Sequence, residues 1–290
     1  MPSAHVNGVD IEYVTDGDPA DPPLLLIPGL GLQLTIWAPG FVNLLREHGF
    51  YVIRLDNRDS GLSGKLDGRP DIISVLGGDL SSVTYSIEDM AEDVAGLVTH
   101  LGIERAHVAG MSLGGMITQT LAIRHPELVA SACSIMSTTG DPTVGAPTDA
   151  AAGALLQPAG SSREDAIARS VEIGRTIGSP KYPAGDDVLR ERAAAAYDRS
   201  YAPDGLARQL AAILSATDRT HALGNVRIPF LVIHGEDDPL ITLSGGQATA
   251  NAVAGSRLLT FPGMGHDLPP QLWDEITEAM AANAIAASRE

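Results

Sequence analysis

The chain has 290 residues, of which 44% are hydrophobic and 19% charged, so it is long enough and apolar enough to bury a sizeable core. Acidic residues number 36 against 19 basic ones, which leaves a net charge of −17, and aromatic residues make up only 4%. This balance disfavours nucleic acid as a partner, because phosphate binding draws on basic side chains and base stacking on aromatic ones. The simplest interpretation of the acidity is solubility.

The single cysteine, Cys133, lies in the apolar run 131–136 and is expected to be a buried strand thiol. One cysteine cannot form an intramolecular disulfide, so nothing indicates an oxidising compartment. The first residues show no basic region followed by an apolar stretch, and no apolar run approaches the ~18 residues that a transmembrane helix needs. We therefore expect a soluble, cytoplasmic protein with no membrane segment.

Short apolar runs alternate with amphipathic segments, which is typical of parallel strands joined by crossover helices. Residues 11–14 alternate between apolar and polar side chains and predict a half-exposed edge strand. Further strands, covered on both faces of a sheet, are predicted from near-continuous apolar runs at 24–27, 51–55, 107–109 and 230–233. Residues 257–261 predict the last strand of the chain.

The clearest predicted helix spans residues 87–101, where apolar residues recur at helical spacing. Ser86 is suited to cap its start and Gly102 to end it. Its acidic residues fall in the first half, where the helix dipole favours negative charge. Residues 271–285 carry large apolar side chains on one side and predict a C-terminal helix that packs against the sheet.

Residues 140–222 differ from the rest of the chain. They are rich in Ala, Gly, Pro and Ser up to residue 162 and contain helix-like stretches near 163–174, 186–199 and 204–215. Because no strong strand pattern interrupts them, we interpret them as a helical cap inserted between two strands. The predicted organisation is a core of residues 1–139 and 223–290 with a cap, or lid, of residues 140–222.

Residues 110–114 read Gly-Met-Ser-Leu-Gly, a G-x-S-x-G pentapeptide between a strand-like run and a helix-like segment. On such a sharp strand-to-helix turn a serine hydroxyl is exposed at the carboxyl edge of the sheet, and glycines let the backbone turn tightly. The pentapeptide alone is a weak signal, since glycine and serine are common. Its flanks strengthen it, and together they predict a nucleophile elbow with Ser112 as the nucleophile.

A serine hydroxyl needs a base to become a nucleophile, and the base needs an acid to orient it. After Ser112, two loops at predicted strand ends supply such groups: Asp237 and Asp238 follow one strand, and His266 follows the last one. Both loops should open on the same edge of the sheet as Ser112. His266 is the predicted base, because His234 lies inside a strand end and suits a hydrogen-bonded core residue. Either aspartate could be the acid.

The acidic segment after residue 233 could also suggest a metal site. Its residues, His234, Glu236, Asp237 and Asp238, lack the helical or hairpin spacing that zinc ligands show. We therefore expect neither a metal nor a cofactor.

With these motifs in place, the chain resembles the α/β-hydrolase superfamily over nearly its whole length. Residues 24–37, residues 56–63 and the Pro-Gly-Met-Gly-His loop are similar to the aclacinomycin methylesterase group of serine carboxylesterases. The resemblance implies an α/β-hydrolase fold, a mostly parallel sheet flanked by helices with an inserted helical cap. It also implies that the acid is Asp238, three residues after the strand-ending glycine, with Glu236 a solvated neighbour or structural acceptor.

The sequence departs from the family pattern at two positions. Pro28 stands where histidine is common, which could reshape the loop but leaves its backbone donor available. Asp59 stands where glycine is common. We assign this second stretch to structure, with Asp56 and Arg58 tying loops together beneath the site.

The tetrahedral intermediate of ester cleavage needs two hydrogen-bond donors for its oxyanion. One is expected to be the backbone N–H of Leu113, the residue after the nucleophile. The resemblance assigns the other to the backbone N–H of Leu30. An apolar substrate pocket, roofed by the cap, is predicted from residues in or beside the site-forming loops: Gly29, Leu32, Trp37, Met111, Met116, Leu240 and Ile241.

The expected activity is cleavage of a small-molecule carboxylic ester by a Ser-His-Asp acyl-enzyme mechanism. A serine at the elbow disfavours haloalkane dehalogenases and epoxide hydrolases, which use aspartate there. Two alternatives of the same fold keep the serine, namely a cofactor-free haloperoxidase (perhydrolase) and a carbon–carbon bond hydrolase. A non-enzymatic alternative is a small-ligand receptor on the same scaffold. The motifs do not specify the acyl part of the substrate, its alcohol part or the oligomeric state.

Overall fold

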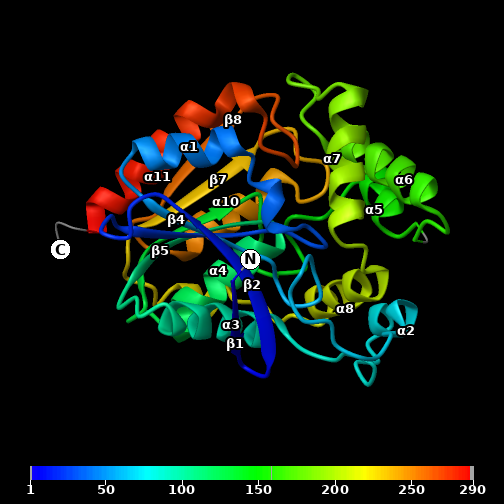
Figure 1. The fold of residues 1–290 in the computed structure, drawn as a ribbon, viewed down its shortest axis with the longest axis horizontal. Coiled ribbons are helices and arrows are strands. Elements are labelled where there is room, and N and C mark those ends of the chain that lie inside the picture. Colours follow the sequence, from blue (N-terminus) through cyan, green and yellow to red (C-terminus); the bar gives the residue numbers. More distant parts are fainter. Residues whose placement is uncertain (1, 158, 288–290) are drawn as a thin grey trace.

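A twisted sheet with helices on both faces forms the centre of the molecule (Figure 1). The computed structural model describes residues 2–157 and 159–287, and in these the sheet has eight strands in the order β1-β2-β4-β3-β5-β6-β7-β8. In chain order the strands are β1 Ser3–Val6, β2 Val9–Asp16, β3 Pro23–Ile27, β4 Tyr51–Leu55, β5 Ala106–Met111, β6 Val129–Ile135, β7 Phe230–Gly235 and β8 Arg257–Phe261. The predicted α/β class with a mostly parallel sheet is confirmed.

Across the sheet from β4 through β3 to β8, every neighbouring pair of strands is parallel. At the other end of the sheet, β1 pairs with β2 and β2 with β4 in antiparallel fashion. The predicted apolar runs correspond to β3, β4, β5, β7 and β8. The side chains of β3, β4, β5 and β7 alternate between two buried clusters, so that Leu25 and Ile27 of β3 face one layer of helices and Leu24 and Leu26 face the other. Burial on both faces explains why these four strands are mostly apolar, whereas β8 at the edge of the sheet is exposed or half-buried over most of its length.

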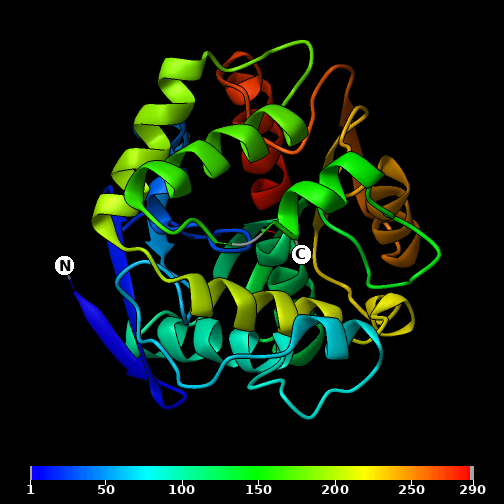
Figure 2. The same cartoon turned by 90° about the vertical axis from the view of Figure 1, so that its right-hand side faces the viewer.

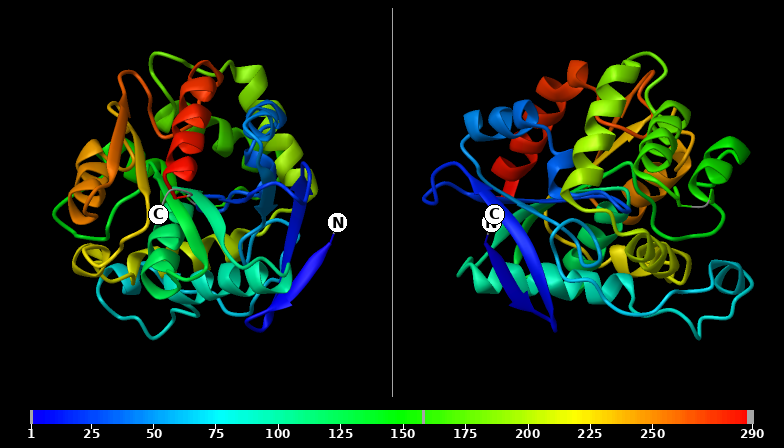
Figure 3. Two further views of the ribbon diagram at one scale, coloured as in Figure 1. Left: turned by 90° about the vertical axis from the view of Figure 1, so that its left-hand side faces the viewer. Right: turned by 45° about the vertical axis from the view of Figure 1, so that its right-hand side comes forward.

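Helices cover the two faces of the sheet separately (Figures 1 and 3). One face carries α1 (Pro39–Glu47) and α11 (Trp273–Ala287), and the other carries α3 (Ile87–His100), α4 (Leu113–Arg124) and α10 (Leu243–Ala252). The predicted helix at 87–101 ends one residue early. Ser86 and Asp89 form its capping box, and Gly102, with φ +68°, follows the C-cap Leu101. The C-terminal helix begins two residues later than predicted, after the 3-10 turn η2 (Pro270–Leu272).

The edge-strand prediction for residues 11–14 is wrong. These residues belong to β2, which pairs with β4 on one side and with β1 on the other, and Ile11 is fully buried. β1 is the outer strand, joined to β2 by a hairpin at Asn7-Gly8, where both residues have positive φ angles of 48° and 78°. An Asn-Gly pair favours this two-residue turn strongly, and reasoning from alternation alone overlooked it.

The segment between β6 and β7 forms helices over the carboxyl edge of the sheet (Figure 2). In its described parts, residues 140–157 and 159–222, no strand interrupts them. Three helices match the predicted stretches: α6 Arg163–Ile177, α7 Asp186–Arg199 and α8 Pro203–Leu214; two more are α5 Asp149–Leu155 and α9 Thr220–Leu223. That residues 140–222 act as one separate cap stays a prediction.

Two short elements complete the path of the chain. η1 (Leu34–Ile36) precedes α1, and α2 (Ile72–Leu76) lies between β4 and α3. Within the described part of the chain, no helix combines the length and apolar character needed to span a membrane.

Candidate active site

Ser112 occupies the sharp turn between β5 and α4, with backbone angles φ 53° and ψ −117°. A positive φ is uncommon for a residue with a side chain and stores strain. The flanking glycines make the turn possible, because a Cβ at Gly110 would lie 2.0 Å from the Gly114 carbonyl oxygen and one at Gly114 would lie 2.2 Å from the Ile27 oxygen. The G-x-S-x-G spacing is therefore a steric requirement of the contact between α4, β5 and β3.

The main chain of the elbow is held by the neighbouring strand β6 and by Ser137, which follows that strand. The backbone N–H of Ser112 donates to the carbonyl of Ile135 at 2.8 Å, and the Ser137 hydroxyl donates to the Ser112 carbonyl at 2.8 Å. Two helical N–H groups of α4 also bond to that carbonyl. The Ser112 hydroxyl is thus left out of the bonds that hold the turn.

Asp238 and His266 meet at the carboxyl ends of the adjacent parallel strands β7 and β8. His266 Nδ1 lies 2.7 Å from Asp238 Oδ2. The Asp238 side chain is fully buried, and its Oδ1 accepts hydrogen bonds from the backbone N–H groups of Leu240 at 2.9 Å and Ile241 at 3.0 Å. Because a carboxylate can only accept, Nδ1 of the imidazole donates, and in the neutral tautomer with this proton it is Nε2 that carries the lone pair.

The competing acids have other partners. Asp237 Oδ2 accepts from the backbone N–H of Gly263 at 2.7 Å, and Glu236 Oε1 accepts from the Thr260 hydroxyl at 2.8 Å. Both residues are exposed, and neither bonds to His266. Of the two aspartates left open by the sequence, Asp238 is the one in contact with the imidazole.

His234 is a core residue that supports the same loop. It is fully buried, its Nε2 lies 2.7 Å from the Ile241 carbonyl, and the same nitrogen lies 3.6 Å from Asp238 Oδ2. Burial lowers the pKa of His234, so the imidazole is held neutral and donates through Nε2. Among the described residues, no group of three or more His, Cys, Asp or Glu side chains could hold a metal ion.

The structure does not join all three predicted catalytic side chains by hydrogen bonds. Ser112 is half-buried, and its hydroxyl bonds to none of the residues that the structure describes. Hydrogen bonds to a nucleophile are often long in hydrolases without substrate and shorten when the reacting complex forms. The link between Ser112 and His266 therefore stays a prediction.

Two backbone donors flank the serine. Leu113 is the first residue of α4, where a helix leaves its N–H groups without partners, and Leu30 lies in the loop after β3. A Cβ at Gly29 would lie 3.3 Å from the Ser112 Cβ, so this loop runs directly against the elbow. Neither the Leu30 nor the Leu113 N–H donates a hydrogen bond within the described chain.

The predicted pocket residues lie in different surroundings. Leu32 and Met111 approach the Cβ position of Gly29 beside the serine, while Trp37 is 1% exposed and stacks on Phe41 with ring centroids 5.7 Å apart. The other predicted pocket residues occupy buried or half-buried positions near the elbow and the Asp238 loop; they are Met116, Leu240 and Ile241. Two surface hollows, of about 500 and 600 Å³, lie on the cap and beside α8, and none of these residues lines them.

Helices of the cap contact both site-forming loops. At the histidine loop, the backbone N–H of His266 donates to the Ile177 carbonyl at 2.7 Å, and that of Gly265 donates to the Ser179 hydroxyl at 2.9 Å. The Ser179 hydroxyl donates in turn to the Asp267 carboxylate, whose pKa is raised by burial. The end of α6 and Ser179 just after it therefore hold the backbone N–H groups of Gly265 and His266.

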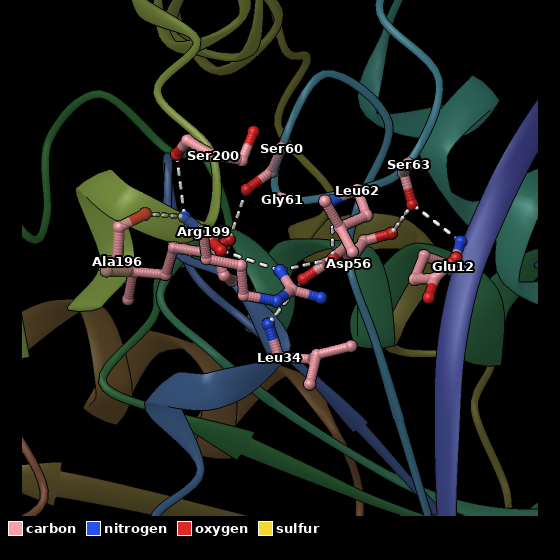
Figure 4. Close-up of polar contacts among 12 residues, drawn as sticks. Glu12, Leu34, Asp56, Ser60, Gly61, Leu62, Ser63, Ala196, Arg199 and Ser200 are labelled. Carbon is pink, nitrogen blue, oxygen red and sulfur yellow. Dashed lines mark hydrogen bonds and ion pairs between the residues drawn. The ribbon is translucent and has the colours of Figure 1, made fainter. Parts of the chain in front are cut away.

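At the loop after β3, the cap contact is a buried polar cluster around Asp56 (Figure 4). Arg199 of α7 donates from Nη1 to Asp56 at 2.8 Å and to the Gln33 side-chain oxygen at 2.7 Å. Asp56 also accepts from the backbone N–H groups of Leu34 and Leu62, at 2.7 and 2.8 Å. Asp56 thus ties together three segments, as expected from the sequence, but its partner in the cap was not predicted.

Arg58 and Asp59 also have structural partners. Arg58 forms a buried two-bond pair with Asp93 of α3, with both distances 2.6 Å, and lies 5.0 Å from the Tyr85 ring centroid. Asp59, with φ +69°, forms a similar pair with Arg208 of α8 at 2.7 and 2.8 Å. The aspartate at this position is therefore explained by an arginine contributed by the cap.

Residues 22–270 match the alpha/beta hydrolase fold family, and the chain belongs to that family. Over 99% of this chain and all of the relative, it is 27% identical to a rhodomycin D methylesterase of Streptomyces peucetius. It is also 27% identical to a bifunctional esterase/perhydrolase of Acinetobacter calcoaceticus, over 95% of this chain and 96% of that protein. The resemblance to methylesterases of this superfamily is confirmed.

Solved structures agree with this assignment of the fold. The enol-lactonase from Burkholderia xenovorans LB400 superimposes with a TM-score of 0.75 over all of both chains, at 24% sequence identity. At this identity the similarity establishes the fold alone.

Proposed function

We propose that this protein is a serine hydrolase that cleaves a small-molecule carboxylic ester through an acyl-enzyme intermediate. The observation that carries the proposal is the buried contact of 2.7 Å between His266 and Asp238, at the same sheet edge as a strained serine elbow. Relatives named methylesterase and esterase/perhydrolase support ester cleavage. No step of the proposed reaction uses a metal or a cofactor.

In the proposed reaction, Ser112 Oγ attacks the ester carbonyl carbon while its proton passes to His266 Nε2. The backbone N–H groups of Leu30 and Leu113 stabilise the negative oxygen of the tetrahedral intermediate. Collapse of this intermediate breaks the bond to the alkoxide oxygen, which leaves as an alcohol with the proton from His266. Asp238 stays ionised and holds the imidazolium in place.

The second half of the reaction repeats the same proton transfers with water. A water molecule gives a proton to His266 Nε2 and attacks the acyl carbon bound to Ser112. The new tetrahedral intermediate collapses, the acid is released, and Ser112 Oγ regains its proton. We place the acyl or alcohol part of the substrate among the predicted pocket residues, beneath the cap.

The test is hydrolysis of a short p-nitrophenyl ester by the protein and by Ser112→Ala. We expect the variant to lose activity by at least about 10³-fold, because the nucleophile is gone, while its fold is kept. A fluorophosphonate probe should label the unmodified protein at Ser112 and leave the variant unlabelled. Retained turnover in the variant would show that another residue is the nucleophile, and absence of labelling with tight small-ligand binding would favour a receptor.

A second candidate activity is perhydrolysis, in which hydrogen peroxide replaces water as the attacking molecule. The similarity to a bifunctional esterase/perhydrolase favours this candidate. Halide oxidation in acetate with peroxide would reveal the peracid. Turnover of a dienone substrate without ester cleavage would instead indicate a carbon–carbon bond hydrolase.

A further inference from the structure

Gln209 of α8 joins the cap to the loop that carries the Leu30 donor. Its side chain is fully buried. Its Oε1 accepts a hydrogen bond from the backbone N–H of Gly31 at 2.8 Å, and its Nε2 donates to the Arg58 carbonyl at 2.8 Å. One amide thus bridges the loop after β3 and the loop after β4.

The Gly31 N–H belongs to the peptide that determines the shape of a tight turn. Residues 29–32 form this turn, closed by a hydrogen bond of 3.1 Å from the Leu32 N–H to the Gly29 carbonyl. Gly31 is its third residue and has φ +66°, the sign that a type II turn requires there. The central Leu30–Gly31 peptide of such a turn can flip between types, which rotates ψ of Leu30 and φ of Gly31. It adjoins the Gly29–Leu30 peptide, whose N–H is the proposed oxyanion donor.

The contact of α8 with this turn is close as well as polar. A Cβ on Gly31 would lie 2.6 Å from Leu206 Cδ1, and a Cβ on Gly205 would lie 2.2 Å from the Asp59 carbonyl oxygen. Helix α8 is therefore seated directly against both loops. In this setting the fully buried Gln209 amide accepts from the Gly31 N–H in a part-buried hydrogen bond.

We propose that Gln209 is a positioning residue, which holds the turn that carries the Leu30 N–H by fixing the adjoining Leu30–Gly31 peptide. This inference rests on the proposed ester hydrolysis. It assigns part of the oxyanion hole to the cap, because the group that holds the turn comes from a helix 178 residues further along the chain. The helix thereby acts on the transition state without touching the substrate.

Gln209→Met tests the proposal, because methionine keeps the length of the side chain and removes both hydrogen bonds. We expect kcat for a p-nitrophenyl ester to fall by about 10-fold, less than the 10²–10³-fold loss typical of deleting an oxyanion donor outright. KM should change by less than about 2-fold, because the interaction affects the transition state more than the bound ester. The affinity for a boronic acid, which forms a tetrahedral adduct on serine, should fall in proportion to kcat/KM.

Arg208→Met is the matched control on the same helix. It removes the buried pair with Asp59 but leaves the Gly31 contact, so we expect it to lower thermal stability while kcat and boronic acid affinity stay within about 3-fold. Gln209→Glu should rescue much of kcat, since a buried neutral acid can accept from Gly31 and donate to Arg58. Should Gln209→Met fail to fold, the shorter Gln209→Asn carries the same expectation.

The proposal is wrong if Gln209→Met keeps its kcat, or if both methionine variants lose kcat and boronic acid affinity equally. The rate of Ser112 labelling by a fluorophosphonate is a further readout, because its phosphoryl oxygen occupies the same hole. The labelling rate distinguishes a failure of the proposed ester hydrolysis from a failure of the proposed role of Gln209. A protein that labels but cleaves no ester contradicts the proposed function, while equal labelling rates in the protein and in Gln209→Met contradict the role of Gln209.

Discussion

Ser112 must keep its hydroxyl free to react while its backbone is held in a strained turn. The backbone turns through φ 53° and ψ −117° and is held by Ile135 of the neighbouring strand and by Ser137 just after it. Strain of this kind, about 1–3 kcal/mol per residue, persists only where surrounding structure fixes it. The elbow is therefore a place where stability is lowered in favour of function.

Ser112→Gly should be more stable than Ser112→Ala by about 1 kcal/mol, because glycine adopts a positive φ without strain and alanine does not. Both variants should be inactive. Urea denaturation of the two purified variants measures the difference. Equal midpoints, or a more stable alanine variant, would mean that the turn carries no strain.

Asp238→Asn should lower kcat by about 10²–10⁴-fold, because an amide can hold the imidazole in the wrong tautomer. Asp237→Asn is the matched control one residue away, since its carboxylate bonds to the Gly263 N–H and not to His266. We expect the control to stay within about 3-fold of the unmodified protein. A larger loss in the control than in Asp238→Asn would reassign the acid.

At the scale of elements, α7 differs from the other long helices in having no buried residue. It packs against α6, and its last turn is tied to the core by the Gln33 amide, which donates to the Ala196 and Ser200 carbonyls at 2.7 and 2.9 Å. Gln33 Oε1 also accepts from Arg199. The attachment of α7 to the core is thus mostly polar and concentrated at one end.

Gln33→Leu should therefore release the end of α7. We expect amide hydrogen exchange in residues 193–201 to speed up by about 10-fold, while amides of the sheet are unchanged. Gln247→Leu, at an exposed position of α10, is the control and should alter neither region. Unchanged exchange in α7 of the Gln33 variant would show that contact with α6 alone holds the helix.

At the scale of the whole molecule, buried histidines link stability to pH. Burial lowers the pKa of His107 on β5 from 6.5 to about 4 and also lowers that of His234 on β7. Both are neutral in the folded protein at pH values where the unfolded chain takes up protons. The contribution of His107 to stability is complete above about pH 6.5 and declines as the pH falls toward 4, and that of His234 also declines with falling pH.

Replacing His107 with Leu should flatten this dependence. Between pH 7 and 5 the variant should lose about 2 kcal/mol less stability than the unmodified protein, because one histidine no longer protonates on unfolding. The hydrogen bond with the Ser131 hydroxyl at 2.8 Å is lost too, but at every pH alike. Denaturation at pH 7, 6 and 5 gives the change of unfolding free energy with pH for the unmodified protein and for the variant. Equal changes in the two proteins would contradict the lowered pKa of His107.

Local features of the chain were predictable because their physical causes are local. The elbow follows from two glycines that make room for one tight turn, and the α3 helix follows from apolar spacing with a capping box at Ser86. The hairpin at Asn7-Gly8 has an equally local cause, because an Asn-Gly pair favours a two-residue turn. In contrast, the contacts of Gln209, Arg199 and Ser179 join segments far apart in sequence, and no pattern around these residues indicates them.

By itself the sequence determined the class of sheet, the sites of most strands and the order in which serine, acid and histidine follow one another, because these depend on residue spacing along a single strand or turn. Only the tertiary structure decided which aspartate meets His266 and which cap residues hold the site-forming loops. Strand pairing and helix docking fix the positions of side chains, and that placement arises from the whole set of contacts, which no short stretch of chain contains.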